Sequence, residues 1–196
     1  MSWQSKSRIS RGVLVGITGA SGIRYAIRLI EVLREKNLLA AVIYSKAAAQ
    51  VAAHEEGLDL EEYLRNNVGN VYRDDDFRAP YASSSSAPES MVIIPCSMNT
   101  LAKIAHGIQD NLVTRAALSM LRLRRKLVLV IRETPLGPIE IRNMLVVSLA
   151  GAVILPAAPG FYSKPKTLND IVDFVVGKVL DVLGIEHNLY KRWGIN

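Results

Sequence analysis

The chain has 196 residues, of which 49% are hydrophobic and 21% charged, which excludes a disordered chain and suits one domain over 1–196. Its net charge of +6 is not collected into one long basic tract, and only 6% of its residues are aromatic, so we expect no nucleic-acid partner. The single cysteine, Cys96, excludes an intramolecular disulfide and fits a reducing compartment. We therefore expect a soluble cytoplasmic protein, with residues 1–11 as a flexible N-terminal extension.

Apolar runs of strand length alternate along the chain with stretches of helical period. Strands are predicted at 13–18, 39–44, 91–95, 127–131 and 152–155. Helices are predicted at 23–36, 47–55, 60–66, 100–106, 112–121, 139–149 and 168–183. Residues 67–90 follow neither pattern and are predicted to be irregular.

Strands that are apolar throughout, each followed by a helix, indicate a parallel sheet covered on both faces. We therefore expect an α/β fold, a flavodoxin-like or Rossmann-like three-layer sandwich with a doubly wound parallel sheet. The uncharged stretch 144–163 is interrupted by Gly151, Pro156 and Pro159, so no membrane span is expected there. In such folds ligands bind beyond the carboxyl ends of the strands, which directs attention to the strand-to-helix junctions.

The first junction contains Gly19, Ala20, Ser21 and Gly22. Glycines let the backbone turn tightly and approach a ligand, and the N–H groups at a helix start attract anions. A phosphorylated cofactor is the favoured interpretation. The alternative is a plain tight turn in which Ser21 caps the helix.

An ordinary dinucleotide fits this junction poorly, because Thr18 occupies a glycine position of the G-x-G-x-x-G pattern. The second strand also ends at Ser45 and Lys46 rather than at the acidic residue that holds an adenosine ribose. An NADP reductase stays open as a minor alternative, because Tyr162 and Lys166 have a Tyr-x-x-x-Lys spacing. The prolines and glycine around them argue against the shared helix face that such a pair needs.

The third junction contains Ser97, Met98, Asn99 and Thr100. Its two hydroxyls, three residues apart at a helix start, can face one phosphate, although an ordinary N-cap has the same pattern. Cys96 is interpreted as a small packed residue. The three histidines are scattered without metal-ligand spacing, so no metal is expected.

The fourth and fifth junctions add charged groups and a phenol. Arg132 could contact a flavin or phosphate and Glu133 could move protons, unless the two merely form a surface ion pair. Residues 156–162 form an apolar loop that ends at Tyr162 and suits an apolar substrate tail with one polar end. The basic group that begins at Arg122 indicates either a solvated helix end or an anionic small-molecule pocket.

Together these junctions closely resemble the flavin prenyltransferase (UbiX) family. The resemblance runs from about residue 12 to residue 195, and its motifs are specific in combination and order. The matching segments are Thr18-Gly19-Ala20-Ser21-Gly22, Ser45-Lys46-Ala47-Ala48, Ser84-Ser85-Ser86-Ala87-Pro88, Pro95-Cys96-Ser97 with Thr100, Asp110-Asn111-Leu112, Arg115-Ala116-Ala117, Arg132-Glu133 with Pro135, residues 151–162 and Arg192-Trp193-Gly194.

The resemblance implies a flavodoxin-like subunit in a homo-oligomer, usually a dodecamer, with sites between subunits. It implies a metal-independent transferase that joins a dimethylallyl group from dimethylallyl monophosphate to N5 and C6 of reduced FMN. The product, prenylated FMN, serves a UbiD-type decarboxylase. A peptidyl-cysteine decarboxylase is the alternative among flavoproteins, but no histidine lies between His54 and His106, where those enzymes need one. A flavin-binding protein without catalysis is the other alternative.

Site residues are carried over by position. FMN binding is implied for Gly19, Ala20, Ser21, Ser45, Ser97, Met98, Asn99, Thr100 and Arg132. Prenyl-phosphate binding is implied for Tyr162 and Lys178, with Arg115 and Arg122 nearby, and Glu55 matches an acidic position near the site. Glu133 is implied as the acid/base, with Ser21 assisting proton relay. One departure is Arg122, where the family commonly has Lys; the charge is kept but the planar fork differs.

Overall fold

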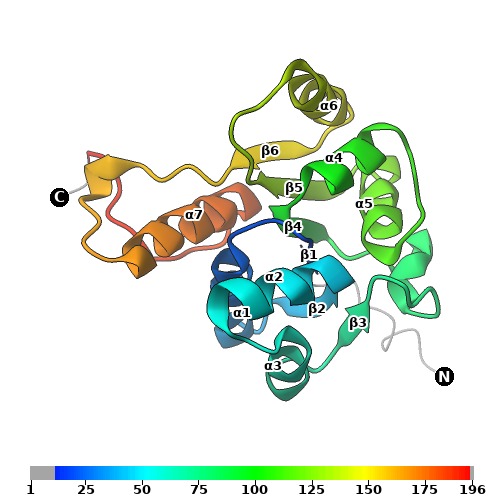
Figure 1. Ribbon diagram of the computed structural model, residues 1–196, viewed down its shortest axis with the longest axis horizontal. Helices are drawn as coiled ribbons and strands as arrows, with labels where there is room; N and C mark the ends of the chain where they lie inside the picture. The colour runs from blue at the N-terminus through cyan, green and yellow to red at the C-terminus, as the bar shows by residue number, and fades with distance from the viewer. Residues whose placement is uncertain (1–11, 195–196) are drawn as a thin grey trace.

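The computed structural model describes residues 12–194 (Figure 1), so the extension expected for residues 1–11 lies outside the described residues. Its six strands form one parallel sheet in the order β3-β2-β1-β4-β5-β6. The strands are β1 (Val13–Ile17), β2 (Leu39–Tyr44), β3 (Val71–Arg73), β4 (Ser90–Cys96), β5 (Lys126–Ile131) and β6 (Val153–Pro156). This order is that of Rossmann-type folds, and the expected doubly wound parallel sheet is confirmed.

Helices cover both faces of the sheet, as expected for a three-layer sandwich (Figure 1). One face carries α1 (Ile23–Glu35), α2 (Lys46–Glu56), α3 (Leu60–Asn67) and α7 (Leu168–Leu183). The other face carries α4 (Met98–Ala105), α5 (Leu112–Arg122) and α6 (Pro138–Leu149). The short 3-10 turns are η2 (Pro80–Ala82), η3 (Ser84–Ser86) and η4 (Phe161–Ser163).

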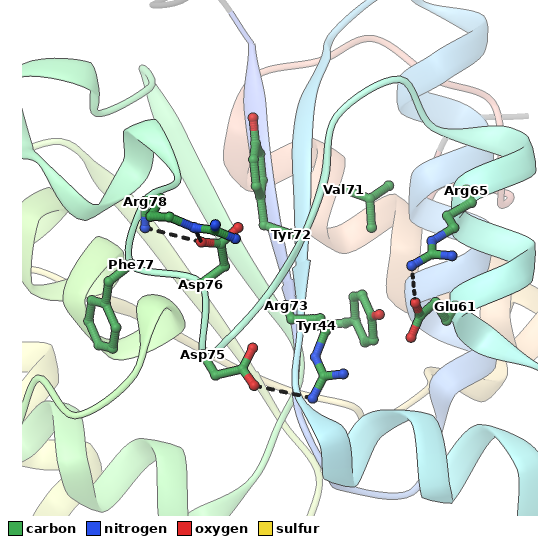
Figure 2. A pocket seen from close by; sticks show the side chains of 10 residues that line it. All are labelled: Tyr44, Glu61, Arg65, Val71, Tyr72, Arg73, Asp75, Asp76, Phe77 and Arg78. Carbon is green, nitrogen blue, oxygen red and sulfur yellow. Dashed lines mark hydrogen bonds and ion pairs between the residues drawn. The ribbon is translucent and has the colours of Figure 1, made fainter.

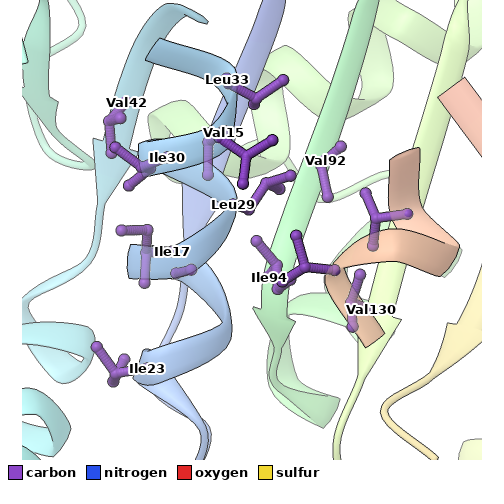
Figure 3. Close-up of a cluster of buried hydrophobic side chains, with 14 of the residues drawn as sticks. Val15, Ile17, Ile23, Leu29, Ile30, Leu33, Val42, Val92, Ile94 and Val130 are labelled. Carbon is purple, nitrogen blue, oxygen red and sulfur yellow. The ribbon is translucent and has the colours of Figure 1, made fainter. Parts of the chain in front are cut away.

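Side-chain alternation along the strands creates a separate hydrophobic core on each face of the sheet. Val15 and Ile17 of β1 point toward α1 and join one core, which Figure 3 shows. Leu14 points the other way and packs under α5. Full burial of such a side chain contributes about 1.5–3 kcal/mol, so both faces of the apolar strands stabilise the fold.

The prediction that residues 67–90 are irregular is wrong for Val71–Arg73, which forms the edge strand β3. Three residues are too few to show a strand pattern in the sequence. They form a strand because β2 offers a free edge, where Val71 lies opposite Val42. Tertiary pairing, rather than local preference, therefore creates β3. The rest of the segment is built around η2 and η3.

The winding direction of the sheet reverses between β1 and β4. The chain runs outward through β2 and β3, returns to β4 beside β1, and continues outward through β5 and β6 on the other side. A crevice beyond the carboxyl ends of β1 and β4 is where ligands bind in such sheets. No helix within residues 12–194 is long and apolar enough to cross a membrane.

Candidate functional site

Thr18 joins the ends of the two strands at the point of reversal. Its Oγ1 donates a hydrogen bond to the carbonyl oxygen of Pro95 (2.8 Å) and accepts one from the N–H of Ser97 (2.8 Å). Thr18 is 3% exposed, so both bonds are shielded from water. The residue that breaks the dinucleotide pattern thus fixes the first and third junctions side by side. The sequence marked Thr18 as a mismatch to the dinucleotide pattern and as part of a family motif, but gave it no structural role.

The turn at residues 19–22 packs against the start of α2. A Cβ on Gly19 would lie 2.4 Å from the Cβ of Ala47 and 3.2 Å from its carbonyl carbon, so no larger residue fits. Ala20 follows in the same turn. Ser45 caps α2, because its Oγ accepts a hydrogen bond from the N–H of Ala48 (3.1 Å). The first and second junctions are therefore in direct contact.

A carboxylate from α2 occupies the start of α1. The N–H of Gly22, at φ 98°, donates to Glu55 Oε2 (2.9 Å), and no side chain of the turn caps the helix. The alternative in which Ser21 caps α1 is therefore not observed. Instead, the Ser21 hydroxyl acts on Glu55 and lowers the pKa of its carboxyl. The anion at this helix start is therefore a carboxylate of the chain itself.

The electrostatics of this cluster favour an ionised Glu55. Burial raises the pKa of its carboxyl, but hydrogen bonds from Ser21 and from the backbone of the helix start outweigh burial. The charge of Arg132 acts in the same direction, so the pKa of Glu55 lies below its ordinary value. Ser21, Glu55 and Arg132 thus form one charged and hydrogen-bonded group beside the point of reversal.

The third junction combines an N-cap with free donors. Ser97 Oγ accepts a hydrogen bond from the N–H of Thr100 (3.2 Å) and donates one to Thr100 Oγ1 (3.0 Å). The N-cap alternative is therefore present. Met98 and Asn99 occupy the first turn of α4, and no described residue accepts a hydrogen bond from their N–H groups. These two donors and the paired hydroxyls can face an anion together.

Cys96, directly before this junction, is fully buried. Burial raises the pKa of its thiol to about 12, so the side chain stays a thiol at neutral pH. It packs in the core under α4 and α5, as the interpretation of a small packed residue predicts.

Arg132 and Glu133 follow β5 and are exposed. Burial raises the pKa of Tyr25 and the charge of Arg132 lowers it, which places the guanidinium near the start of α1. Glu133 Oε1 accepts a hydrogen bond from the N–H of Thr134 (3.0 Å). Among the ion pairs of residues 12–194, none joins Arg132 to Glu133, so the surface-pair alternative is not observed.

Tyr162 and Lys178 lie together beside α7. The Tyr162 ring packs edge-on against Phe174, with ring centroids 5.6 Å apart. The Nζ of Lys178 lies 4.9 Å from the centroid of the Tyr190 ring. A hydrogen bond to Tyr190 outweighs burial and, with Tyr162 nearby, holds the pKa of Lys178 above its ordinary value. Lys178 therefore stays cationic, which suits a phosphate ligand.

Arg115 and Arg122 lie on α5, on the opposite face of the sheet from α7 (Figure 1). Arg115 Nε donates to the carbonyl oxygen of Ala82 (2.6 Å). Arg122 Nη2 donates to Ser119 Oγ (2.9 Å) at the end of the helix that leads into β5. The structure therefore does not bring these two arginines together with Tyr162 and Lys178 within one chain.

A hollow of about 750 Å³ lies beside the edge strand β3, and no predicted site residue lines it (Figure 2). Its charged side chains pair with one another. Arg73 Nη2 lies 3.2 Å from Asp75 Oδ2, Arg78 Nε lies 3.0 Å from Asp76 Oδ1, and Arg65 pairs with Glu61. With its cations already matched by carboxylates, the hollow has no built anion site.

Metal ligands do not gather in the part of the chain that the structure describes. Within residues 12–194, no group of three or more His, Cys, Asp or Glu side chains could hold a metal ion.

Known proteins similar to this chain agree on one family. The family model described as Flavoprotein matches residues 2–180. Flavin prenyltransferase UbiX of Thermoplasma acidophilum is 47% identical over 181 residues, which are 92% of this chain and 99% of the relative.

Solved structures agree with these sequence relatives. AnUbiX (PadA1), in complex with FMN and dimethylallyl pyrophosphate, superposes with a TM-score of 0.90 at 39% identity over 94% of this chain and 97% of its own. A dodecameric FMN-dependent UbiX-like decarboxylase from Escherichia coli O157:H7 gives a TM-score of 0.89 at 39% identity over 93% and 98%. Peptidyl-cysteine decarboxylase EpiD, at 18% identity and a TM-score of 0.62, shares the fold alone.

Proposed function

We infer the function from a family assignment: the chain belongs to the flavin prenyltransferases of the flavoprotein family. It joins a dimethylallyl group from dimethylallyl monophosphate to reduced FMN at N5 and C6, and the prenylated FMN serves a UbiD-type decarboxylase. The observation that carries this conclusion is 47% identity to a flavin prenyltransferase over 92% of the chain. The peptidyl-cysteine decarboxylase alternative is not favoured, because its likeness is limited to the fold.

We propose that one chain supplies the FMN half of the site at the β1–β4 reversal. Thr18 fixes the first and third junctions together, and Gly19 admits only backbone beside α2. The N–H groups at the start of α4 and the hydroxyls of Ser97 and Thr100 suit a phosphate, while Arg132 lies close to the start of α1. Bound here, reduced flavin would supply electron-rich N5 and C6 atoms to the prenyl group.

The prenyl-phosphate half requires fixed cations. Breaking an allylic carbon–oxygen bond leaves negative charge on the phosphate, and preorganised donors stabilise it. Lys178 and the Tyr162 hydroxyl serve this purpose on the α7 side, and Arg115 and Arg122 serve it on the α5 side. Because α5 and α7 cover opposite faces of the sheet, these groups meet only where two copies of the chain pack together.

Glu133 is proposed as the acid/base. Ring closure at C6 requires the removal of a proton there, and an exposed carboxylate after β5 stands at the ligand edge of the sheet. Ser21 is proposed to assist proton relay, because its hydroxyl and the charge of Arg132 both lower the pKa of Glu55. Glu55, held ionised, orients that hydroxyl.

A homo-oligomer completes such a site. Helix α6 presents exposed apolar side chains on its solvent-facing side: Ile139 is 70% exposed, Ile141 55%, Leu145 58% and Leu149 79%. Exposed apolar patches of this kind often mark contact surfaces, so we propose that α6 contacts another copy, as in a dodecamer like that of the relative from Escherichia coli. Contact between copies would also exclude water from the reacting groups.

Two further features belong to the proposal. The chain is one flavoprotein domain, because a single sheet contains all six strands. The transfer needs no metal, because arginine and lysine side chains supply the positive charge that the departing phosphate requires. Activity that persists in EDTA at the level of untreated enzyme is the expected result, and loss of activity that Mg²⁺ restores would refute metal independence.

Mass spectrometry of the flavin tests the proposed function. Pure protein is incubated without oxygen with reduced FMN and dimethylallyl monophosphate, and in a parallel reaction with the diphosphate. We expect a flavin heavier by one five-carbon unit. Unmodified flavin with both donors would contradict the proposal and would favour the alternative of a flavin-binding protein without catalysis.

A further inference from the structure

The C-terminal segment, residues 185–194, folds back along α7. Gly184, at φ 75°, ends the helix and reverses the chain. Gly177 in the middle of α7 lets the segment approach closely, because a Cβ there would lie 2.5 Å from Tyr190 Cδ1 and 2.7 Å from His187 Cε1. The returning segment therefore lies against the helix face that carries Lys178.

One carboxylate on α7 binds three side chains of the returning segment. Asp181 Oδ1 accepts hydrogen bonds from Arg192 Nη2 (2.7 Å) and His187 Nε2 (3.1 Å), and Oδ2 accepts one from the Tyr190 hydroxyl. The N–H of Leu189 donates to His187 Nδ1 (3.2 Å), which leaves the ring proton on Nε2, facing Asp181. The His187 side chain is only 2% exposed.

The same segment contacts Lys178 and Tyr162, the two residues proposed to bind the prenyl phosphate on the α7 side. The Nζ of Lys178 lies over the Tyr190 ring and 3.7 Å from Asp181 Oδ2. The ring of Tyr162 packs edge-on against Trp193, with ring centroids 5.4 Å apart. Lys178 thus rests on one residue of the returning segment and Tyr162 on another. Arg192 also balances the charge of Asp181, so the charge of Lys178 remains available to a phosphate.

We propose that Asp181 is a positioning residue that fixes the C-terminal segment on α7 and thereby orients Lys178 and Tyr162 toward the prenyl phosphate. This inference rests on the proposed function. Asp181 itself is an anion and does not bind the phosphate. Its effect is exerted through Tyr190, which supports Lys178, and through Trp193, which packs against Tyr162.

Two roles of Asp181 predict opposite changes in donor affinity. If only its charge mattered, Asp181→Asn would remove an anion beside Lys178 and tighten the binding of dimethylallyl monophosphate. If it positions the segment, the same change releases Tyr190 and Arg192 and weakens the binding of that donor. Asp173→Asn is the matched control, because Asp173 lies on the same helix but pairs with Arg28 on the α1 side (2.6 Å).

The test measures donor affinity by calorimetry on protein loaded with oxidised FMN, which does not require turnover. For Asp181→Asn we expect about tenfold weaker donor binding, a loss of about 1.4 kcal/mol, with unchanged FMN affinity. We also expect faster tryptic cleavage after Lys191 and Arg192. Tyr190→Phe should change donor affinity in the same direction by a smaller factor, and Asp181→Glu should restore part of it.

Unchanged or tighter donor binding by Asp181→Asn, with the C-terminal segment released, would overturn the inference. So would equal weakening in the Asp173→Asn control. Wild-type protein that binds the donor but never transfers the prenyl group would refute the proposed function, while the comparison of donor affinities would still decide the role of Asp181.

Discussion

The β1–β4 reversal and the C-terminal segment (residues 185–194) on α7 are held in place in different ways. At the reversal, a buried threonine hydroxyl bonds two main-chain groups of the neighbouring strand end, and glycine contacts fix the turns. The C-terminal segment forms no strand of the sheet, and half-exposed charged and aromatic side chains hold it on α7. Buried main-chain bonds cost more to break than exposed ion pairs. The proposed FMN half is therefore a rigid part of the fold, and the proposed phosphate half depends on added contacts.

The largest effect is expected for Glu133→Gln. The variant keeps the shape of the side chain but cannot take up a proton, so prenylation should slow by about a hundredfold to ten-thousandfold. FMN affinity should not change, because Glu133 bonds only to the N–H of Thr134 among the described residues. Rapid-quench assays and flavin binding measured on the same preparation check both statements. Full activity in the variant would show that Glu133 is not the acid/base.

Assembly variants should separate the two halves of the site. Leu145→Glu combined with Leu149→Glu places charges on exposed apolar positions of α6, and we expect smaller assemblies by mass photometry. Prenylation should fall strongly, because the α5 and α7 groups no longer meet, while FMN binding should fall less. Leu145→Met combined with Leu149→Met is the matched control and should assemble normally. A fully assembled glutamate variant would exclude α6 as the contact.

A smaller effect, on the free energy of unfolding, is expected for substitution of Thr18, which joins the first and third junctions. Thr18→Val keeps the shape of the side chain but leaves the Ser97 N–H without its partner and removes one of two hydrogen bonds to the Pro95 carbonyl, which still accepts from the Thr18 N–H (3.3 Å). Loss of a buried partner costs about 1–3 kcal/mol, which denaturant unfolding can measure. FMN affinity should fall as well. Thr18→Ser retains the hydroxyl and should behave close to wild type, and equal stability of the Ser and Val variants would show that the two bonds do not hold the junction.

The smallest effect is expected in the stability of the protein at acid pH, through Asp181 and its bonds to the C-terminal segment. Burial raises the pKa of Asp181, but hydrogen bonds from Arg192, Tyr190 and His187 outweigh it and lower this pKa from 3.8 to about 2. A lowered pKa stabilises the folded state above the unfolded value, and that contribution disappears as pH falls through about 2. Stability between pH 4 and pH 2 should therefore decline less steeply in Asp181→Asn than in wild type. If the stability of wild type and of Asp181→Asn declined in parallel over this pH range, the hydrogen bonds to Asp181 would be contradicted.

The sequence predicts the regular elements of the FMN half well, because long apolar runs and helical periods are local signals. It also directs attention to the strand-to-helix junctions, since the carboxyl ends of parallel strands share one edge of the sheet. The bridge from Thr18 was not predicted, because it depends on β4 lying beside β1. The strand Val71–Arg73 was missed because pairing with β2 alone creates it.

The contacts of the proposed phosphate half could not be predicted from local sequence signals. Nothing in the sequence near Asp181 indicates that residues 185–194 return to it, because that contact depends on the reversal at Gly184 and on the space left by Gly177. Likewise, the placement of Arg122 and Lys178 on opposite layers follows from the order of the strands and not from any motif. Charged surface residues carry few local constraints, so their partners are set by tertiary and subunit contacts.

Subunit complementation tests most directly whether two copies share each site. Arg122→Ala and Lys178→Ala chains are coexpressed, and the mixed assemblies are assayed for prenylated FMN. A site that takes α5 from one copy and α7 from another is intact in about a quarter of random pairings, so about a quarter of wild-type activity should return. A control mixture of Lys178→Ala and Tyr162→Phe, both on the α7 side, should recover nothing. If the first mixture were as inactive as its parents, the two halves would not come from different chains.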